Sequence, residues 1–248
     1  MQRARLTRYG LLSVTGTDAR AFLHAQLTND IEHLSSDRAA LAGWCSAKGR
    51  LLASFLVIPR ADGFFLQLSR DLAAPVAKRL SMFILRSRVK ITDESESWEQ
   101  FGVWDARLST AGVSWSGDVA TIRVGDERFL QLAPRGHLQE AANADEAQWA
   151  LQEIRAGRPL ITSATQDQFV PQMVNFEQLG GVDFKKGCYP GQEIVARAQY
   201  RGQVKRRMVH ATAPAGVALQ PGADYNGGTV VDVAPAENGS ELLAVVPI

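Results

Sequence analysis

Residues 183–200 have the sequence DFKKGCYPGQEIVARAQY, and Cys188 within them is one of only two cysteines in 248 residues. Two lysines precede Cys188, a Tyr-Pro-Gly turn follows it, and helix-forming residues begin at Gln192. Free cysteines in reducing compartments are often small buried hydrophobes. Here, however, nearby ammonium groups and a helix N-terminus would both stabilise a thiolate. The local sequence therefore favours a functional thiol, with Lys186 as its cationic neighbour.

The residues around this cysteine are small on one side and strongly basic on the other. Gly187 and Gly191 carry no side chain, so a ligand can approach the backbone closely. Between residues 185 and 207 there are seven basic residues and one acid, which makes +6 in a chain whose net charge is +1. The basic residues are Lys185, Lys186, Arg197, Arg201, Lys205, Arg206 and Arg207, and the acid is Glu193. A solvated basic face, a nucleic-acid surface and a site for an anionic small molecule all fit this charge. Aromatic residues for base stacking are few, which favours a ligand bearing carboxylate or phosphate.

The composition is that of a soluble globular protein, with 46% hydrophobic and 21% charged residues. Two cysteines form no disulfide framework and fit a reducing compartment. The first ten residues carry basic side chains without a following apolar segment, so no secretory signal is predicted. No apolar run approaches the length of a membrane span. These features predict a cytoplasmic protein without a membrane partner.

Hydrophobic periodicity and turn residues predict a mixture of helices and strands. The opening segment, 11–27, is expected to form strand, turn and helix, and 40–68 to form consecutive strands turning at Lys48-Gly49 and 61–63. Further expectations are a helix over 71–85, strands over 88–92 and 100–105, a hairpin over 119–132, helices over 135–143 and 145–156, and an irregular stretch over 160–190. Short apolar runs separated by Pro, Gly and Asn follow residue 202. The order predicts an α+β fold with a separate C-terminal β domain.

Other motifs that carry chemistry are weak or missing. The four histidines are scattered, and neither cysteine has a CxxC partner, so no zinc site is predicted. There is no GxGxxG, Walker or nucleophile-elbow sequence. Cys45 follows Trp44 in a strand pattern and is expected in the core.

The segment KKGCYPGQEIVARAQYRGQVKRR, residues 185–207, resembles the signature of the YgfZ family of folate-binding proteins, relatives of the glycine-cleavage T protein, an aminomethyltransferase. The matching motif is K-G-C-[YF]-x-G-Q-E, beginning here at Lys186. The likeness extends over most of the chain. VTGTDARAFLHAQLTND, CSAKGRLLASF and FVPQMVNFEQLGGVDF are similar to the family's opening, its K-G-R turn and the segment leading to the cysteine.

This resemblance implies a ring of two ferredoxin-like αβ units and a small C-terminal antiparallel β-barrel, around a folate-sized pocket. The expected domains are 1–48 with 110–200, 49–109, and 201–248. It also implies binding of tetrahydrofolate or a one-carbon derivative, and support of iron–sulfur cluster assembly or repair. The clients would include the radical enzymes that methylthiolate tRNA. The basic surplus would then pair with folate carboxylates, which arginine binds in bidentate fashion.

One departure from the T proteins bears on activity. Where T proteins have K-G-G-x-x-D-D, this chain has Lys48 to Ser54, so Ala53 and Ser54 replace aspartates. An aspartate there is expected to act on the folate nitrogen, and neither replacement can transfer a proton as a carboxylate does. The resemblance thus implies the T-protein fold without aminomethyltransferase activity.

Three functions stay open from the sequence: a folate-binding accessory protein for iron–sulfur clusters and tRNA modification, a folate-dependent one-carbon transferase, and a tRNA- or protein-binding module without a small ligand. In the first, Cys188 holds a transient iron–sulfur cluster, iron or a one-carbon adduct, and Lys186 favours its thiolate. The expected folate-binding residues are Asn29, Asp30, Glu177, Tyr189, Gln192, Glu193 and Arg197, with Gly187 and Gly191 shaping the motif.

Overall fold

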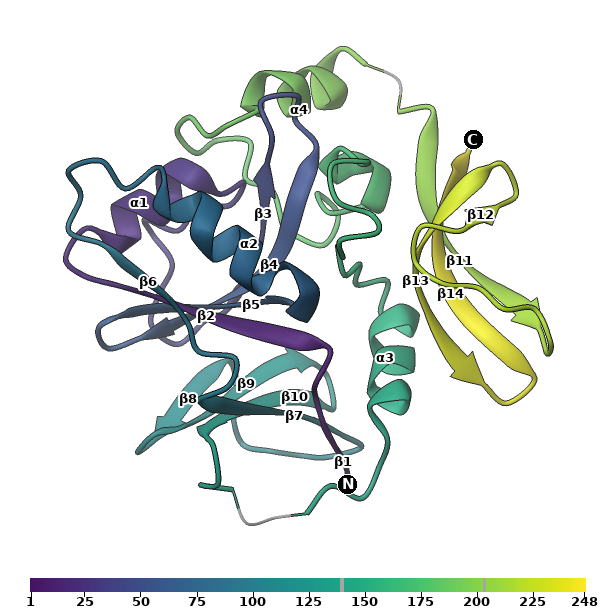
Figure 1. Ribbon diagram of the computed structural model, residues 1–248, viewed down its shortest axis with the longest axis horizontal. Helices are drawn as coiled ribbons and strands as arrows, with labels where there is room; N and C mark the ends of the chain where they lie inside the picture. Colours follow the sequence, from purple (N-terminus) through teal and green to yellow (C-terminus); the bar gives the residue numbers. More distant parts are fainter. Residues whose placement is uncertain (139–140, 203) are drawn as a thin grey trace. The chain divides into compact units, whose positions relative to one another are not determined.

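The computed structural model describes residues 1–138, 141–202 and 204–248 (Figure 1). The chain forms two compact units. Unit 1 comprises Met1–Phe22, Glu32–Ala40 and Leu56–Trp149, and unit 2 comprises Leu23–Ile31, Leu41–Phe55 and Ala150–Ile248. The division into three domains expected from the sequence stays a prediction.

Unit 1 contains two sets of antiparallel strands. In the first, the second half of β4 (Leu51–Arg60) pairs with β5 (Gly63–Ser69), β5 with β2 (Tyr9–Thr15), and β2 with β6 (Lys90–Asp93). The second is a five-stranded sheet in the order β1 (Gln2–Arg5), β7 (Trp98–Trp104), β10 (Arg128–Pro134), β9 (Val119–Gly125) and β8 (Val113–Ser116). β9 and β10 confirm the hairpin expected over 119–132.

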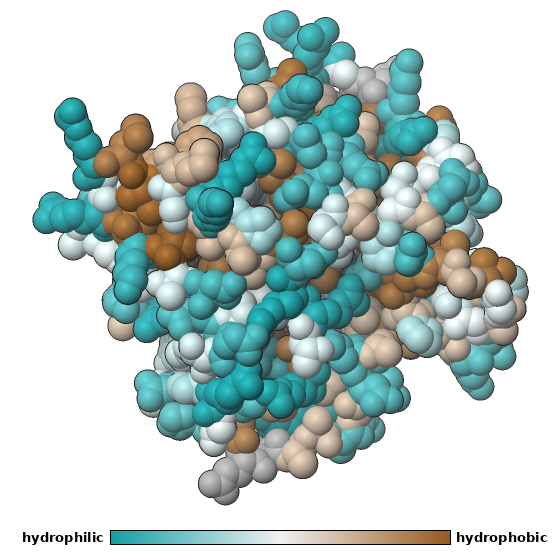
Figure 2. Space-filling model, viewed as in Figure 1, coloured by the Kyte–Doolittle hydropathy of each residue, from teal (hydrophilic) through white to brown (hydrophobic). Residues whose placement is uncertain are grey.

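Helix α2 (Arg70–Ser81) lies against β2 and β6 and buries Leu72, Val76 and Leu80, as its period predicts. It ends four residues earlier than expected. The expected helix over 71–85 includes Phe83, which lies beyond the observed helix and is 43% exposed, beside Met82 and Leu85, which are 70% and 88% exposed. Figure 2 shows this hydrophobic region at the upper left, over the segment that joins α2 to β6.

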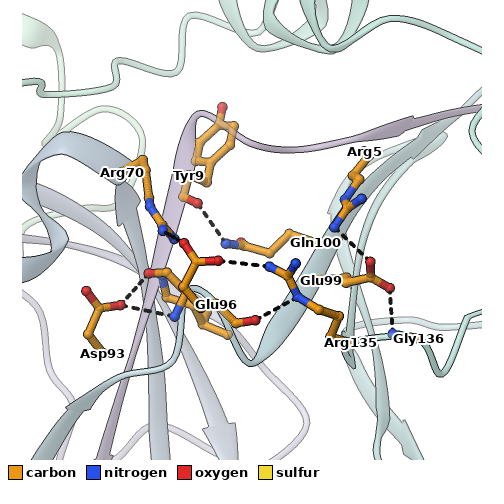
Figure 3. A network of polar contacts seen from close by, with 11 residues as sticks. Arg5, Tyr9, Arg70, Asp93, Glu96, Glu99, Gln100, Arg135 and Gly136 are labelled. Carbon is orange, nitrogen blue, oxygen red and sulfur yellow. Dashed lines mark hydrogen bonds and ion pairs between the residues drawn. The ribbon is translucent and has the colours of Figure 1, made fainter.

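A polar network joins the acidic segment 93–99 to arginines of unit 1 (Figure 3). Glu96 accepts hydrogen bonds from Arg70 and, at 3.0 Å, from Arg135, while Glu99 pairs with Arg5 at 2.9 Å. The acidic and polar sequence of residues 92–99 predicts a solvated loop. Its two ends instead belong to β6 and β7, and Glu96 and Glu99 form ion pairs within the unit.

Unit 2 begins with the end of helix α1 (Ala19–Gln26) and contains most of β3 (Ala40–Cys45) and the first half of β4. It also contains helix α3 (Glu146–Arg155) from Ala150 onward and helix α4 (Gln192–Tyr200). Helix α3 confirms the pattern over 145–156, and Gly157 caps it with a left-handed φ of 65°. The helix expected over 135–143 is wrong for residues 135–138 and 141–143, and residues 139–140 lie outside the described part. Residues 160–190 are irregular, as predicted, except for the 3-10 helix η1 (Pro171–Val174).

The C-terminal part of unit 2 is a four-stranded antiparallel sheet in the order β11 (Arg206–Pro214), β14 (Gly239–Pro247), β13 (Gly228–Ala236) and β12 (Asp224–Tyr225). Figure 1 shows it curled into a half-barrel. Val230, Leu242 and Ala244 form its buried core. The β-only tail expected from the sequence is confirmed.

Candidate functional site

The cysteine loop is held against the K-G-R turn by two glycines. Gly191 precedes α4 with a φ of 79°, a left-handed conformation that favours glycine. A Cβ built on Gly191 would lie 2.4 Å from the backbone oxygen of Ser46 and 2.7 Å from Cα of Gly49. Gly49 itself has a φ of 69°, and its Cβ would meet Ile194 of α4 at 2.8 Å. Two motifs far apart in the sequence are therefore packed backbone to backbone, which leaves no room for a side chain at either glycine.

Lys186 is buried and holds the C-terminal end of α1. Its Nζ donates hydrogen bonds to the backbone oxygen of His24 and, at 2.8 Å, to that of Leu27. The ammonium also lies 4.8 Å from the centre of the Tyr189 ring. These are carbonyls that a helix end leaves without a partner, so the lysine satisfies them as a capping group.

Burial lowers the pKa of Lys186 to about 8, against the opposing charges of Asp30, Asp183 and Cys188, which raise it. The sequence expectation placed this ammonium beside the thiol, and the contribution of Cys188 to its pKa agrees with that proximity. The lysine has a second task that its sequence position did not indicate, because its hydrogen bonds go to α1.

The depressed pKa of Lys186 predicts a pH effect on stability. Since the folded protein disfavours the charged amine, this residue penalises folding below about pH 8, and the penalty is relieved as pH rises towards the unfolded value of 10.5. Relative to Lys186→Met, the wild type should gain about 2 kcal/mol of unfolding free energy between pH 8 and about pH 10. Urea titrations at several pH values measure this. Lys185→Met, at the exposed neighbour, is the control, and an equal trend in both variants would contradict the assignment.

The two cysteines lie in opposite environments. Cys188 is exposed, whereas Cys45 is buried and burial, followed by the charge of Asp167, raises its pKa to about 12. The expectation that Cys45 belongs to the core is confirmed. Behind Cys188, the carboxylate of Asp183 accepts hydrogen bonds from the backbone N–H of Lys185 and Lys186 at 2.7 and 3.2 Å, which shapes the loop.

The remaining motif residues lie close to this loop in the sequence but differ in exposure. Tyr189 is buried, and burial raises the pKa of its hydroxyl. On α4, Gln192 is half-buried, and Glu193 and Arg197 are exposed. Tyr189 thus supports the loop through its ring, while Glu193 and Arg197 face solvent.

Asn29 and Asp30 follow α1 and have different tasks. The Asn29 amide donates at 2.7 Å to the backbone oxygens of Leu41 and Gly180, so both amide hydrogens connect segments of the chain. Asp30 lies 3.2 Å from Nδ1 of His24. The sequence had left His24 among the scattered histidines, because a spacing of six residues across a helix end matches no common motif.

Glu177 and Arg207 line an open cavity of about 710 Å³ in unit 2, together with Lys205 and residues at the end of α4. Oε1 of Glu177 accepts a hydrogen bond from Arg207 at 2.5 Å. Its other oxygen, Oε2, is buried and has no partner among the described residues. A carboxylate oxygen held without a donor is costly, so it is suited to a ligand that brings one. Cys188 is not among the described residues that line this cavity.

Positions 53 and 54 offer no carboxylate and no spare hydroxyl. Ala53 is fully buried, and Oγ of Ser54 accepts from the N–H of Ile161 and donates to the oxygen of Pro159. Within the described ranges, no group of three or more His, Cys, Asp or Glu side chains is placed to hold a metal ion. Nor does any helix described here have the length and apolar character needed to cross a membrane.

The chain is similar over nearly its whole length to curated proteins. It is 32% identical over 274 residues to the tRNA-modifying protein YgfZ of Serratia proteamaculans, with 97% of this chain and 82% of the relative covered. It is 34% identical over 228 residues to that of Edwardsiella ictaluri, with 82% and 69% covered. No protein-family model matches the chain.

Among solved structures, the aminomethyltransferase T of the glycine cleavage system from Bartonella henselae superposes with a TM-score of 0.75 at 16% identity, covering 99% of this chain and 78% of that one. This likeness establishes the fold, which is that of the T proteins, as the resemblance implied. With relatives that share about a third of its residues over most of both lengths, the chain belongs to the YgfZ family of tRNA-modifying proteins.

Proposed function

We propose that this protein binds tetrahydrofolate, or a one-carbon derivative of it, and supports iron–sulfur cluster assembly or repair for tRNA modification in the cytoplasm. The observation that carries the folate part is the carboxylate of Glu177, a residue that lines a cavity of about 710 Å³ and has one buried oxygen without a partner among the described residues. That volume lies in the roughly 300–1,000 Å³ range of small-molecule sites.

A pterin ring suits this carboxylate because it presents neighbouring N–H donors along one edge. Arg207 already holds Oε1 of Glu177, which fixes the orientation of the carboxylate. Oε2 would then accept from the ring, and the hydrogen bond would be charge-assisted. Such a bond would satisfy an oxygen for which the described residues supply no donor.

The cavity also offers cations for the acidic end of a folate. Lys205 is exposed and lines the cavity together with Arg207. Folates carry glutamate carboxylates, and a lysine at the cavity edge would pair with one of them. This accounts for part of the basic surplus between residues 185 and 207 without invoking nucleic acid.

The thiol of Cys188 would carry the second half of the function. It is exposed, and Lys186 lies close enough for the two charges to interact. The curated relatives are named tRNA-modifying proteins, which supports a role beside the iron–sulfur enzymes that methylthiolate tRNA. In that role Cys188 holds a cluster, iron or a one-carbon adduct transiently. Asn29, Asp30, Tyr189, Gln192, Glu193 and Arg197 stay proposals as folate contacts.

Calorimetric titration with tetrahydrofolate tests the ligand, and complementation tests the thiol. Wild type and Cys188→Ala should bind tetrahydrofolate with affinities within about twofold of each other, because the cavity does not include the thiol. In a strain lacking the protein, Cys188→Ala should fail to restore iron–sulfur enzyme activity.

The folate part and the thiol part of the proposal can be contradicted independently of each other. No heat of binding with either protein would remove folate from the proposal and favour a module without a small ligand. Full restoration of activity by Cys188→Ala would show that the thiol is only structural.

A further inference from the structure

The loop that carries Cys188 runs directly past His24. Lys186 donates a hydrogen bond to the backbone oxygen of His24, and a Cβ built on the next residue, Gly187, would lie 3.7 Å from Nε2 of the same histidine. Cys188 is the third residue of this run. Nε2 of the imidazole therefore lies beside the backbone of Gly187, the residue that precedes Cys188.

The other edge of the imidazole is held by a carboxylate. Nδ1 of His24 lies 3.2 Å from Oδ1 of Asp30, and the two side chains are 21% and 25% exposed. A carboxylate at Nδ1 favours the tautomer with the proton on Nδ1, so that Nε2 carries the lone pair. This arrangement of nucleophile, imidazole and orienting acid is the one that activates thiols and hydroxyls in unrelated folds.

We propose that His24, oriented by Asp30, is the proton acceptor that activates the Cys188 thiol. The S–H bond breaks, its electron pair stays on sulfur, and the proton forms an N–H bond at Nε2. The products are a thiolate and an imidazolium, so the total charge is unchanged. Sγ is exposed and has no hydrogen bond to a described residue, and the proposed transfer requires a rotation about Cα–Cβ that brings it to the ring.

The other charged groups near the thiol are engaged elsewhere or exposed to solvent, so His24 is the group proposed to accept the proton. Lys186 is committed to the two carbonyls of α1, and Asp183 to the loop's backbone N–H groups. Lys185 is exposed to solvent. Asp30 is the remaining charge, and its contact with His24 compensates the imidazolium once it forms. The inference adds a positioning pair to the thiol of the proposed function, and rests on that function only for its biological purpose.

The rate of Cys188 alkylation by iodoacetamide, followed across pH by peptide mass spectrometry, tests the proposal. A neighbouring imidazolium lowers a thiol pKa from about 8.5 into the range of roughly 3.5–7.5. At about pH 6.5, His24→Gln should react about fivefold more slowly than wild type, and the two rates should converge above about pH 9.5. Asp30→Asn should lose part of the same reactivity, because the ring is no longer oriented.

His137→Gln, the same substitution at an exposed histidine of unit 1, is the matched control and should leave the profile unchanged. Cys45, buried in every variant, reports in the same samples whether the fold is intact. Superimposable profiles for wild type and His24→Gln would overturn the proposal, and an unchanged Asp30→Asn would remove Asp30 from it. Because no folate is present, the result is independent of whether folate binding is found.

Discussion

Gly191→Ala is expected to lower the free energy of unfolding by about 3 kcal/mol or more. The alanine would have to adopt a φ of 79°, and its Cβ would fall 2.4 Å from the backbone oxygen of Ser46 and 2.8 Å from the backbone nitrogen of Gly49. Backbone atoms cannot move aside as a flexible side chain can. The turn and the start of α4 must therefore separate, and the cysteine loop between Lys186 and Gly191 moves with them.

Gly157→Ala separates the steric effect from the cost of the left-handed conformation. Gly157 has a φ of 65° and nothing within 4 Å of its Cβ position, so alanine there should cost only about 1 kcal/mol. Urea unfolding of both variants measures the difference. Equal losses would mean that the turn and α4 are not packed as tightly as described.

Glu177→Gln is expected to weaken tetrahydrofolate binding about 100-fold. The substitution keeps the size of the side chain but replaces the carboxylate by an amide, which removes the charge and one acceptor. A pterin that donates to Oε2 loses a charge-assisted hydrogen bond, and the amide N–H₂ would face another donor. Calorimetric titration at constant ionic strength gives the affinity.

Gln178 lines the same cavity and provides the control. Gln178→Ala should change the affinity for tetrahydrofolate by no more than about twofold. Since Glu177 also pairs with Arg207, thermal unfolding of each variant shows whether a loss of affinity reflects a loss of structure. Wild-type affinity in a folded Glu177→Gln protein would contradict the placement of the pterin on this residue, while leaving folate binding elsewhere open.

The parts of the fold that were predictable from the sequence are those with local causes. The hairpin at Gly125 follows from turn residues between alternating strands, and the end of α3 follows from a glycine that adopts a left-handed φ. The helix expected over 135–143 is absent from the described residues of that range, because apolar spacing alone does not show whether a partner surface exists. The helix expected over 71–85 is too long for a related reason. Apolar residues at helical spacing continue as far as Phe83, although α2 ends at Ser81.

The candidate site also contains residues that could be predicted from the sequence and contacts that could not. Lys186, Gly187, Cys188 and Gly191 stand together in the sequence and could be named from it, although the segments that hold their loop, at Ser46–Gly49 and the end of α1, are far away in the chain. The pairing of His24 with Asp30 depends on how the chain turns after α1, and the orientation of Glu177 depends on its contact with Arg207, 30 residues away. Family resemblance alone points to Glu177, whereas the lack of a donor to one of its oxygens among the described residues is a property of the folded chain.

The hydrogen bond from Lys186 to Leu27 joins residues 159 positions apart, and it has a consequence for biogenesis. A ribosome-bound chain that has emerged only as far as α1 has no lysine for the open carbonyls, so the helix end stays frayed until the later segment arrives. The thiol then reaches its final setting in the same event that completes unit 2. Chains that end before Lys186 lack both this cap and Cys188, so the helix end and the thiol are completed by the same late segment of the chain.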